Sequence, residues 1–209
     1  MRPFEIIHCE QGSEAWYAAR CGRITGTRFA DLMAGATTKT YENMILDIVG
    51  EILTGEVEEG FSNDAMQRGK DLEPEAREAY EDTTGNLVEQ FGFIVPDAES
   101  QFHDFIGISP DGLLIEQPGM IEIKCPLRKT HLNYLIRGKL PADYYWQVHG
   151  QLFVTGLEFC DFFSYYPGLK PLLVRVEKDQ AVHEQIEGRL LSAIPEIKAK
   201  LSLYERFGK

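Results

Sequence analysis

Two short segments in the middle of the chain carry residue types at a spacing that suits hydrolysis of a phosphodiester bond. Asp111 stands between a proline and a glycine, and ten residues separate it from Glu122 in the run Ile121-Glu122-Ile123-Lys124-Cys125. On a strand, residues two apart share a face, so we expect Glu122 and Lys124 to point into one cleft while the isoleucines enter the core. Pro118-Gly119 can reverse the chain. The resulting hairpin would bring Asp111 beside Glu122.

This set of side chains suits a metal-dependent nuclease. Two carboxylates supply hard oxygen ligands for Mg²⁺ or Mn²⁺, and such ions lower the pKa of a bound water and clamp a phosphate. Lys124 can orient or deprotonate that water or stabilise the anionic transition state, and adjacent metal ions would favour a lowered lysine pKa. Each fragment alone also fits a structural role: Pro110-Asp111-Gly112 as a turn, Glu122 and Lys124 as a solvated strand face. The combination favours catalysis.

The surrounding sequence predicts one α/β domain, residues 1–209, with a central mixed sheet flanked by helices. We expect an N-terminal helical part at about 13–84, a catalytic sheet core at about 86–177 and a C-terminal helix at about 179–207. Further helices are expected at 130–137 and 142–154. β-rich runs predict strands at 87–95, 105–109, 113–115, 120–125, 159–166 and 172–177.

Helix boundaries are predicted from capping residues and prolines. Ser13 can cap a helix over 15–20, and Thr25 or Thr27 can cap a second one that runs to Ala34. An apolar stripe of helical period predicts a third helix that begins at Thr40 and ends at Gly55. A fourth helical stretch covers 63–84, where Pro74 predicts a kink or a fresh start, and Pro195 predicts a kink in the last helix.

Composition and charge limit the classes of function. A formal net charge of −12 opposes DNA binding, because affinity for phosphates comes largely from Lys and Arg. Clustered carboxylates that hold cations would remove part of the conflict. So would a local basic face, which is indicated by Arg128, Lys129, Arg137 and Lys139. Four scattered cysteines without a CxxC pair argue against a zinc finger. With no apolar membrane span and no signal-peptide core, we expect a cytosolic protein.

The same residues resemble a known family. Asp111 with Glu122-Ile123-Lys124 is similar to the PD…(D/E)xK signature of a nuclease superfamily, which implies a restriction-endonuclease-like core. Further segments resemble the phage lambda exonuclease family, the alkaline, recombination exonucleases of prophages. They occur in the family's order: Ala15–Arg20, Gly22–Thr27, Arg68–Glu73, Ser109–Leu113, Glu122–Pro126 and Trp146–Gln151. The resemblance therefore spans most of the chain.

The resemblance implies a role for each matched catalytic residue. Asp111, Glu122 and the backbone carbonyl of Ile123 would ligate the metal. Glu73 would assist at a second ion or through water, although a glutamate beside a proline also fits an exposed surface acid. Lys124 would position the nucleophile.

The resemblance also implies contacts with DNA outside the metal site. Gln147 would contact the lysine, the water or the scissile strand. Arg20, Thr27 and Ser109 match positions that form a pocket for the DNA's 5′-phosphate, with Thr27 where a serine is typical. Arg20 could instead pair with Glu14 or another surface carboxylate.

The activity implied by the resemblance is that of a 5′→3′ exonuclease on double-stranded DNA. It would start at a 5′-phosphorylated end, use one or two Mg²⁺ ions with Mn²⁺ as a possible substitute, and leave 3′ single-stranded tails for recombination. The implied partners are two further copies of the chain in a homotrimeric ring and a single-strand annealing protein, with no membrane involved. The implied location of the protein is the cytoplasm of a bacterial host cell. The alternatives are an endonuclease of restriction or junction-resolving type and a non-catalytic DNA-binding or assembly module.

Overall fold

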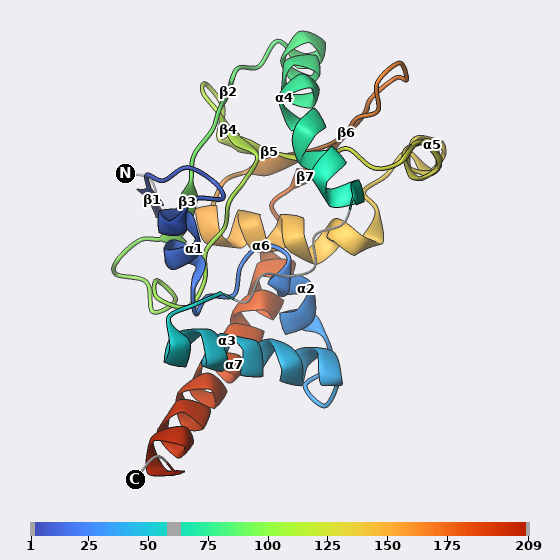
Figure 1. Cartoon of the computed structure of the whole chain (residues 1–209). Coiled ribbons are helices and arrows are strands. Elements are labelled where there is room, and N and C mark those ends of the chain that lie inside the picture. Colours follow the sequence, from blue (N-terminus) through green and yellow to red (C-terminus); the bar gives the residue numbers. More distant parts are fainter. Residues whose placement is uncertain (1–2, 58–63, 208–209) are drawn as a thin grey trace.

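A five-stranded mixed sheet lies between helical layers in the computed structural model, which describes residues 3–57 and 64–207 except for the side chains of 64–66 (Figure 1). Its strand order is β2-β4-β5-β6-β7. The pair β5·β6 is parallel and the other neighbours are antiparallel. The strands are β2 (Val88–Glu89), β4 (Gly112–Leu114), β5 (Gly119–Lys124), β6 (Phe159–Ser164) and β7 (Leu172–Glu177). The predicted fold class is confirmed.

Two helices cover the central strand from opposite faces. α4 (Asp64–Thr84) packs Ala76 and Tyr80 against Ile121 and Ile123 in a small apolar cluster. α6 (Tyr145–Thr155) contacts the other side, and it follows a short 3₁₀ turn η1 (Ala142–Tyr144) and α5 (Arg128–Arg137). The hydrophobic faces of sheet and helix are thereby buried against each other, which leaves the polar residues of β5 facing α6.

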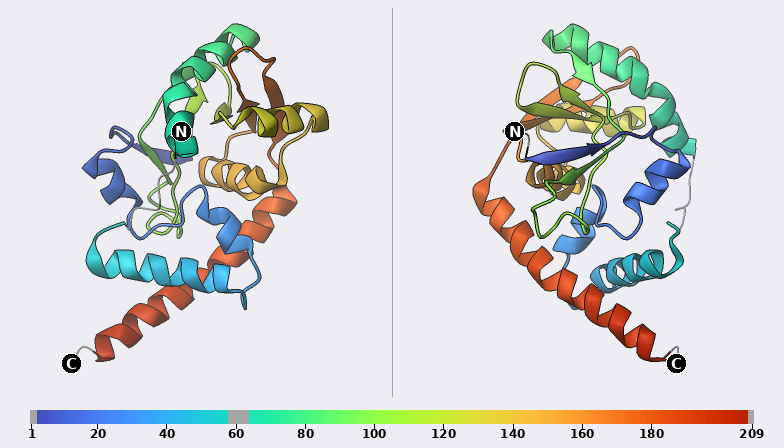
Figure 2. Two further views of the ribbon diagram at one scale, coloured as in Figure 1. Left: turned by 45° about the vertical axis from the view of Figure 1, so that its right-hand side comes forward. Right: turned by 90° about the vertical axis from the view of Figure 1, so that its left-hand side faces the viewer.

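A larger core joins the N-terminal helices to the C-terminal one. α2 (Arg28–Met33) and α3 (Lys39–Thr54) pack against α6 and α7 (Gln180–Phe207), while α1 (Glu14–Arg20) contacts the strand β3 (Phe93–Pro96) outside the five-stranded sheet. Phe29, Ile45, Leu152 and Ile186 are fully buried in this cluster. Figure 2 shows α3 and α7 crossing below the sheet and the end of α7 projecting from the body. No helix within the described ranges is long and apolar enough to cross a membrane.

Several local predictions are confirmed at the helix ends. Ser13 caps α1 by accepting a hydrogen bond from the Trp16 N–H, and Gly55 ends α3 in the left-handed region with φ of +73°. Thr27 precedes α2, but its side chain makes no capping hydrogen bond. Of the two outcomes expected near Pro74, the fresh helix start is wrong, because α4 runs through the proline, and the kink stays a prediction. Packing of the next turn against the sheet outweighs the missing backbone hydrogen bond.

The strand predictions before β4 need correction. The expected strand over 87–95 divides into β2 and β3 (Phe93–Pro96), and β3 pairs with an unpredicted strand, β1 (Phe4–Ile7), in a separate two-stranded sheet. The expected strand over 105–109 is reduced to two isolated bridges, one from Ile106 to Ile24 and one from Ile108 to Ile94. These bridges connect the loop before α2 and strand β3 through a buried apolar segment. The segment is apolar because it is buried, and it forms no continuous strand ladder.

Candidate active site

The hairpin β4–β5 places Asp111 beside the central strand. Gly112 pairs with Ile121, so Asp111, the residue just before β4, stands at the position opposite Glu122. Its Oδ2 accepts a 2.6 Å hydrogen bond from the Ile123 N–H. A residue's N–H and C=O point to the same side of an extended strand, so the Ile123 carbonyl also faces the edge where Asp111 lies. The chain thus gathers a carboxylate and a backbone oxygen at one open stretch of strand edge.

Alternation along β5 separates the apolar side chains from the charged ones. Ile121 and Ile123 are buried on the face covered by α4. Glu122 and Lys124 share the other face, where the Lys124 Nζ lies 2.5 Å from the Glu122 Oε1. The lysine ammonium also lies 5.1 Å from the ring centroid of Tyr144. Glu122 and Lys124 are therefore a contacting pair beneath α6 rather than separate groups on a solvated strand face.

Two amides of α6 fix the Glu122 carboxylate. Gln147 Nε2 donates to Oε1 at 2.6 Å and Gln151 Nε2 donates to Oε2 at 2.7 Å. Only 1% of Glu122 is exposed, so these donors take the place of water around a buried charge. Sequence reasoning gave Gln147 a role beside the lysine, the water or the DNA, and it gave Gln151 none. The available signal was the spacing of four residues, which puts both amides on one helix face.

Burial and crowding of like charges perturb the titration of the central groups. Burial, followed by the nearby charge of Glu122, raises the pKa of Asp111 well above its ordinary value. Burial alone would lower the pKa of Lys124, but Glu122 and Asp111 outweigh it and the net pKa is raised. The lysine is therefore held as an ammonium ion. The expected lowering of its pKa presupposes bound metal ions.

Glu73 reaches the same region from α4. Its Oε1 accepts a 2.6 Å hydrogen bond from Arg77 one turn later, and the side chain is 28% exposed. Burial raises its pKa, Arg77 opposes that shift, and the charge of Glu122 adds to it. Glu73 is thus half-buried within electrostatic reach of Glu122, with an arginine as its direct partner.

The donor set fits a hard divalent cation, although no group of three or more His, Cys, Asp or Glu side chains in the described ranges is close enough to hold one alone. Mg²⁺ commonly uses one or two carboxylates and completes its shell with water and substrate phosphate. Asp111 and Glu122 offer two carboxylates. Their negative charges repel each other in a poorly solvated place, and a bound cation would relieve that repulsion. The Ile123 carbonyl supplies a further hard oxygen at the same edge.

A second polar cluster joins α1 to the segment before Asp111. The Trp16 Nε1–H donates to Ser109 Oγ at 2.8 Å, and Arg20 donates to the same oxygen at 3.5 Å and to Thr25 Oγ1 at 3.3 Å. The guanidinium carbon lies 4.1 Å from the Trp16 ring centroid. Arg20 therefore contacts Ser109, which precedes Asp111 by two residues in the sequence. Thr27 is exposed at the start of α2 and has no described bond to either.

Arg20 lacks a carboxylate partner among the described residues: no ion pair within 4.0 Å joins it to Glu14 or to any other acid there. Burial, followed by the like charge of Arg28, lowers its pKa to about 10. A partly desolvated guanidinium with only hydroxyl partners has unused capacity for a bidentate anion. The free donors of Arg20 lie beside Ser109, which is two residues from Asp111 in the sequence.

A buried glutamate of α3 holds the loop that carries this cluster. Glu51 is 4% exposed and accepts hydrogen bonds from the Gly22 N–H at 2.9 Å and from both terminal nitrogens of Arg28. Gly22 has φ of +73°, and a Cβ there would lie 2.6 Å from Ile52 Cγ1. The loop between α1 and α2 is therefore tied to α3 by an ion pair and by a close backbone approach that only glycine allows.

Comparisons with known proteins agree with this arrangement. The family model described as YqaJ-like viral recombinase domain matches residues 15–158. An alkaline exonuclease from Laribacter hongkongensis is similar over 94% of this chain and 98% of its own, with 34% identity and a TM-score of 0.84. The same enzyme in complex with dAMP matches at 34% identity with a TM-score of 0.83, over 94% of this chain and 98% of that one.

A more distant likeness concerns the fold. A phage-related exonuclease from Haemophilus somnus has a TM-score of 0.65 at 15% identity, over 87% of this chain and 96% of that one. Among curated proteins, no sequence matches.

Proposed function

The chain belongs to the YqaJ-like viral recombinase family and is a nuclease of the exonuclease type, and from this premise we propose that it digests one strand of linear double-stranded DNA in the 5′→3′ direction. It would release mononucleotides and leave 3′ single-stranded tails for recombination by strand annealing. The observation that carries the proposal is the convergence of Asp111, Glu122 and Lys124 at the end of one hairpin. A buried and a half-buried carboxylate beside an ammonium ion suit phosphodiester hydrolysis.

Magnesium is the proposed cofactor, at one or two ions per site, with Mn²⁺ as a substitute. Asp111, Glu122 and the Ile123 carbonyl would hold it, and Glu73 would turn from Arg77 to assist. When bound, the ion supplies a water of lowered pKa and neutralises charge on the phosphate. Lys124, released from Glu122, would donate to the attacking water or to a phosphate oxygen. Gln147 and Gln151 would hold the Glu122 carboxylate in its orientation.

Selection of the DNA end is proposed to rest on Arg20 and Ser109. A guanidinium forms paired hydrogen bonds with phosphate, and a hydroxyl adds a third donor. Thr27 would contribute a further hydroxyl at the start of α2. The distance along the chain from Ser109 to Asp111 is two residues. A terminal phosphate held there would place the neighbouring phosphodiester near the carboxylates.

The net charge of −12 bears on how the enzyme would stay on DNA. We propose a homotrimeric ring that DNA threads, because a closed ring retains DNA by topology and needs no large basic surface. The 3′ tail would pass to a single-strand annealing protein. These events would take place in the cytoplasm of a bacterial host cell.

The test uses linear duplexes with either a 5′-phosphate or a 5′-hydroxyl, labelled separately at each terminus and incubated with protein and Mg²⁺. Expected products are mononucleotides from the 5′ side, released faster from phosphorylated ends. Asp111→Ala and Lys124→Ala should each abolish release without loss of the folded state by circular dichroism. Cleavage of covalently closed plasmid as fast as linear DNA would contradict the exonuclease assignment and favour an endonuclease of the same fold. Full activity in excess EDTA would refute the metal requirement.

A further inference from the structure

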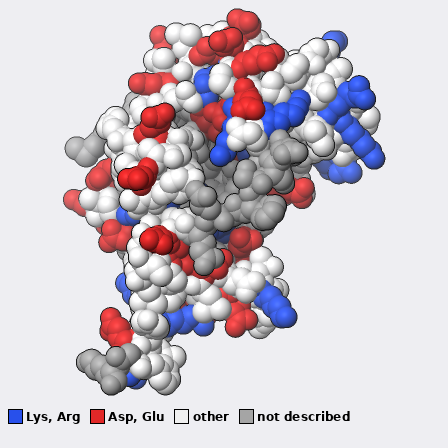
Figure 3. All heavy atoms as spheres, viewed as in Figure 1, with Lys and Arg blue, Asp and Glu red and all other residues white. Residues whose placement is uncertain are grey.

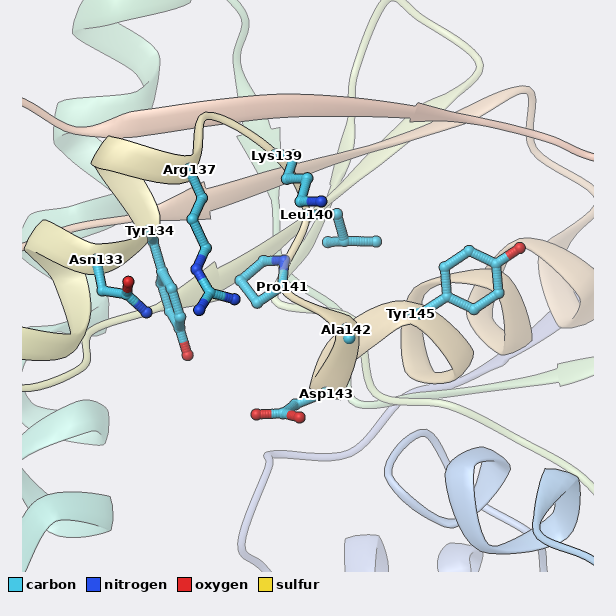
Figure 4. Close-up of a pocket in the computed structure, with 9 residues that line it drawn as sticks. All are labelled: Asn133, Tyr134, Arg137, Lys139, Leu140, Pro141, Ala142, Asp143 and Tyr145. Carbon is cyan, nitrogen blue, oxygen red and sulfur yellow. The ribbon is translucent and has the colours of Figure 1, made fainter.

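A pocket of about 380 Å³ lies between the C-terminal end of α5 and η1, outside the cluster of carboxylates. The aromatic residues Tyr134 and Tyr145, the cations Arg137 and Lys139, and Asn133 contribute to its lining. Figure 4 shows Arg137 and Tyr134 extending from α5 toward the segment that carries Pro141 and Asp143. The proposed chemistry at the metal site uses none of these side chains.

The pocket has a charge unlike that of the chain as a whole. Asp143 is the only acidic residue between Glu122 and Glu158, whereas the same stretch carries five Lys and Arg residues. Neither Arg137 nor Lys139 forms an ion pair with the acids of the described ranges, and both are exposed. In Figure 3 the blue side chains gather at the side of the molecule where α5 lies, while the upper surface is mostly red. On a protein of net charge −12, this is a locally positive surface, which favours the approach of anions.

Aromatic contacts connect the pocket to the active-site lysine. Tyr134 is 8% exposed and its ring centroid lies 6.4 Å from that of Tyr144. The Tyr144 ring in turn lies 5.1 Å from the Lys124 Nζ. One aromatic side chain therefore separates the wall of the pocket from the catalytic group. A short stretch of one DNA strand can reach both places.

The chemistry of the lining matches a nucleotide. Arg137 and Lys139 provide charge for a backbone phosphate, and Asn133 offers donor and acceptor groups for a base edge. Tyr145 is 36% exposed, lines the pocket and contacts Trp146 and His149 on its other sides, so its ring is a supported platform for a base. Single-strand binding sites combine a basic groove with such aromatic surfaces.

We propose that this pocket binds an unpaired nucleotide of a single DNA strand next to the active site, with its phosphate on Arg137 and Lys139 and its base on Tyr145. The inference rests on the proposed function, since it assumes that DNA lies at the carboxylates. It adds a second contact, on α5 and η1, to the one proposed for Arg20 on α1. Such a contact would keep a strand in register as it moves past the carboxylates.

The binding test is done in EDTA, so that cleavage and binding are measured separately. Fluorescence anisotropy of a labelled oligothymidylate is recorded against salt for the full chain and for Arg137→Ala–Lys139→Ala. Arg137 and Lys139 together would neutralise one phosphate, so their loss should reduce the slope of log affinity against log salt by about 0.7, the contribution of one phosphate on a single strand. The matched control, Lys198→Ala–Lys200→Ala, removes the same charge from α7 and should leave the slope unchanged. A slope for the pocket variant equal to that of the unaltered chain would overturn the proposal.

Base stacking is tested with Tyr145. Tyr145→Ala should weaken oligothymidylate binding about tenfold, equivalent to about 1.4 kcal/mol, whereas Tyr145→Phe keeps the ring and should bind as the unaltered chain does. An abasic oligonucleotide of the same length should bind more weakly and be insensitive to Tyr145→Ala. Equal binding of poly-L-glutamate at equal charge would instead identify a general polyanion surface and refute a nucleotide pocket.

The outcomes separate this inference from the proposed function. A chain that degrades no DNA with Mg²⁺ but loses oligothymidylate binding in both pocket variants would refute the nuclease assignment and support the pocket. A chain that degrades DNA from 5′-ends but binds oligothymidylate equally in all variants would support the proposed function and refute the nucleotide pocket. Circular dichroism of each variant tests for loss of fold, which should not occur in the pocket variants because Arg137, Lys139 and Tyr145 are exposed.

Discussion

Replacing Arg20 by methionine should abolish the preference for 5′-phosphate at almost no cost in stability. Burial, followed by the charge of Arg28, lowers the pKa of Arg20 from 12.5 to about 10. The folded state therefore disfavours the charged guanidinium by about 3 kcal/mol at any pH below that range, and the penalty fades as the pH rises through about 10. Methionine retains the apolar stem and removes the charge.

Lost contacts offset most of this gain. Arg20 donates two hydrogen bonds, to Ser109 and Thr25, each worth about 1 kcal/mol, and a contact with the Trp16 ring worth about 0.5–2 kcal/mol. The free energy of unfolding of Arg20→Met should therefore stay within about 1 kcal/mol of that of the unaltered chain. A guanidinium–phosphate hydrogen bond contributes about 1.5–3 kcal/mol, so the rate ratio between 5′-phosphate and 5′-hydroxyl duplexes should fall roughly 10- to 150-fold.

The assay combines urea unfolding with single-turnover digestion of the two duplexes. Arg20→Lys keeps the charge but loses the fork, and it should retain part of the preference. Arg23→Met, three residues later in the chain, is the matched control, since the Arg23 guanidinium donates to the Ala19 carbonyl at 2.8 Å and is not in the Ser109 cluster. Equal slowing of both duplexes, or destabilisation by several kcal/mol, would show that Arg20 supports the fold rather than the end of the DNA.

Three further predictions concern the supports of the site. Gln151→Ala removes a buried amide donor from the active-site glutamate and should lower kcat about 10- to 100-fold in Mg²⁺-saturated digestion, with little change in KM. Glu51→Ala leaves the half-buried Arg28 without its partner and should lower the free energy of unfolding in urea by about 2–4 kcal/mol. Gly22→Ala should cost about 2–4 kcal/mol, from positive φ and a steric clash, against about 1 kcal/mol for Gly55→Ala, where φ is the same and nothing lies nearby.

Each of these three has an outcome that contradicts it. Gln151→Ala with unchanged kcat would mean that Gln147 alone fixes the carboxylate. A Glu51→Ala chain as stable as the original would show that water replaces the ion pair. Equal melting temperatures for the two glycine variants would show that α3 moves aside at no cost.

The hairpin of the candidate site was predictable because its signals are local. Alternation of apolar and charged residues in β5 fixes which side chains share a face, and the turn before Gly119 fixes the register. Asp111 and Glu122 therefore came together as expected. The same locality made α1 predictable from Ser13.

Other features depend on contacts between residues far apart in the sequence. β1 exists because Phe4–Ile7 meets β3 almost ninety residues later, and nothing in four residues announces that partner. Gln151 acquires its place only once α6 is laid across β5, with Glu122 29 residues away. Thr25, rather than Thr27, meets Arg20 because the loop is pulled toward α3 by Glu51. Such tertiary contacts override local preference.

The hydrogen bond from the Ile123 amide to Asp111 makes that proton a spectroscopic reporter of the site. It points at a carboxylate instead of a neighbouring strand, so its chemical shift should follow the ionisation of that side chain and the arrival of a cation. The hydrogen–deuterium exchange of the Ile123 amide should slow only when the edge of β5 beside Asp111 is covered. A single assigned resonance in a spectrum of the intact chain would thus titrate the central acid directly, without turnover and without any nucleic acid present.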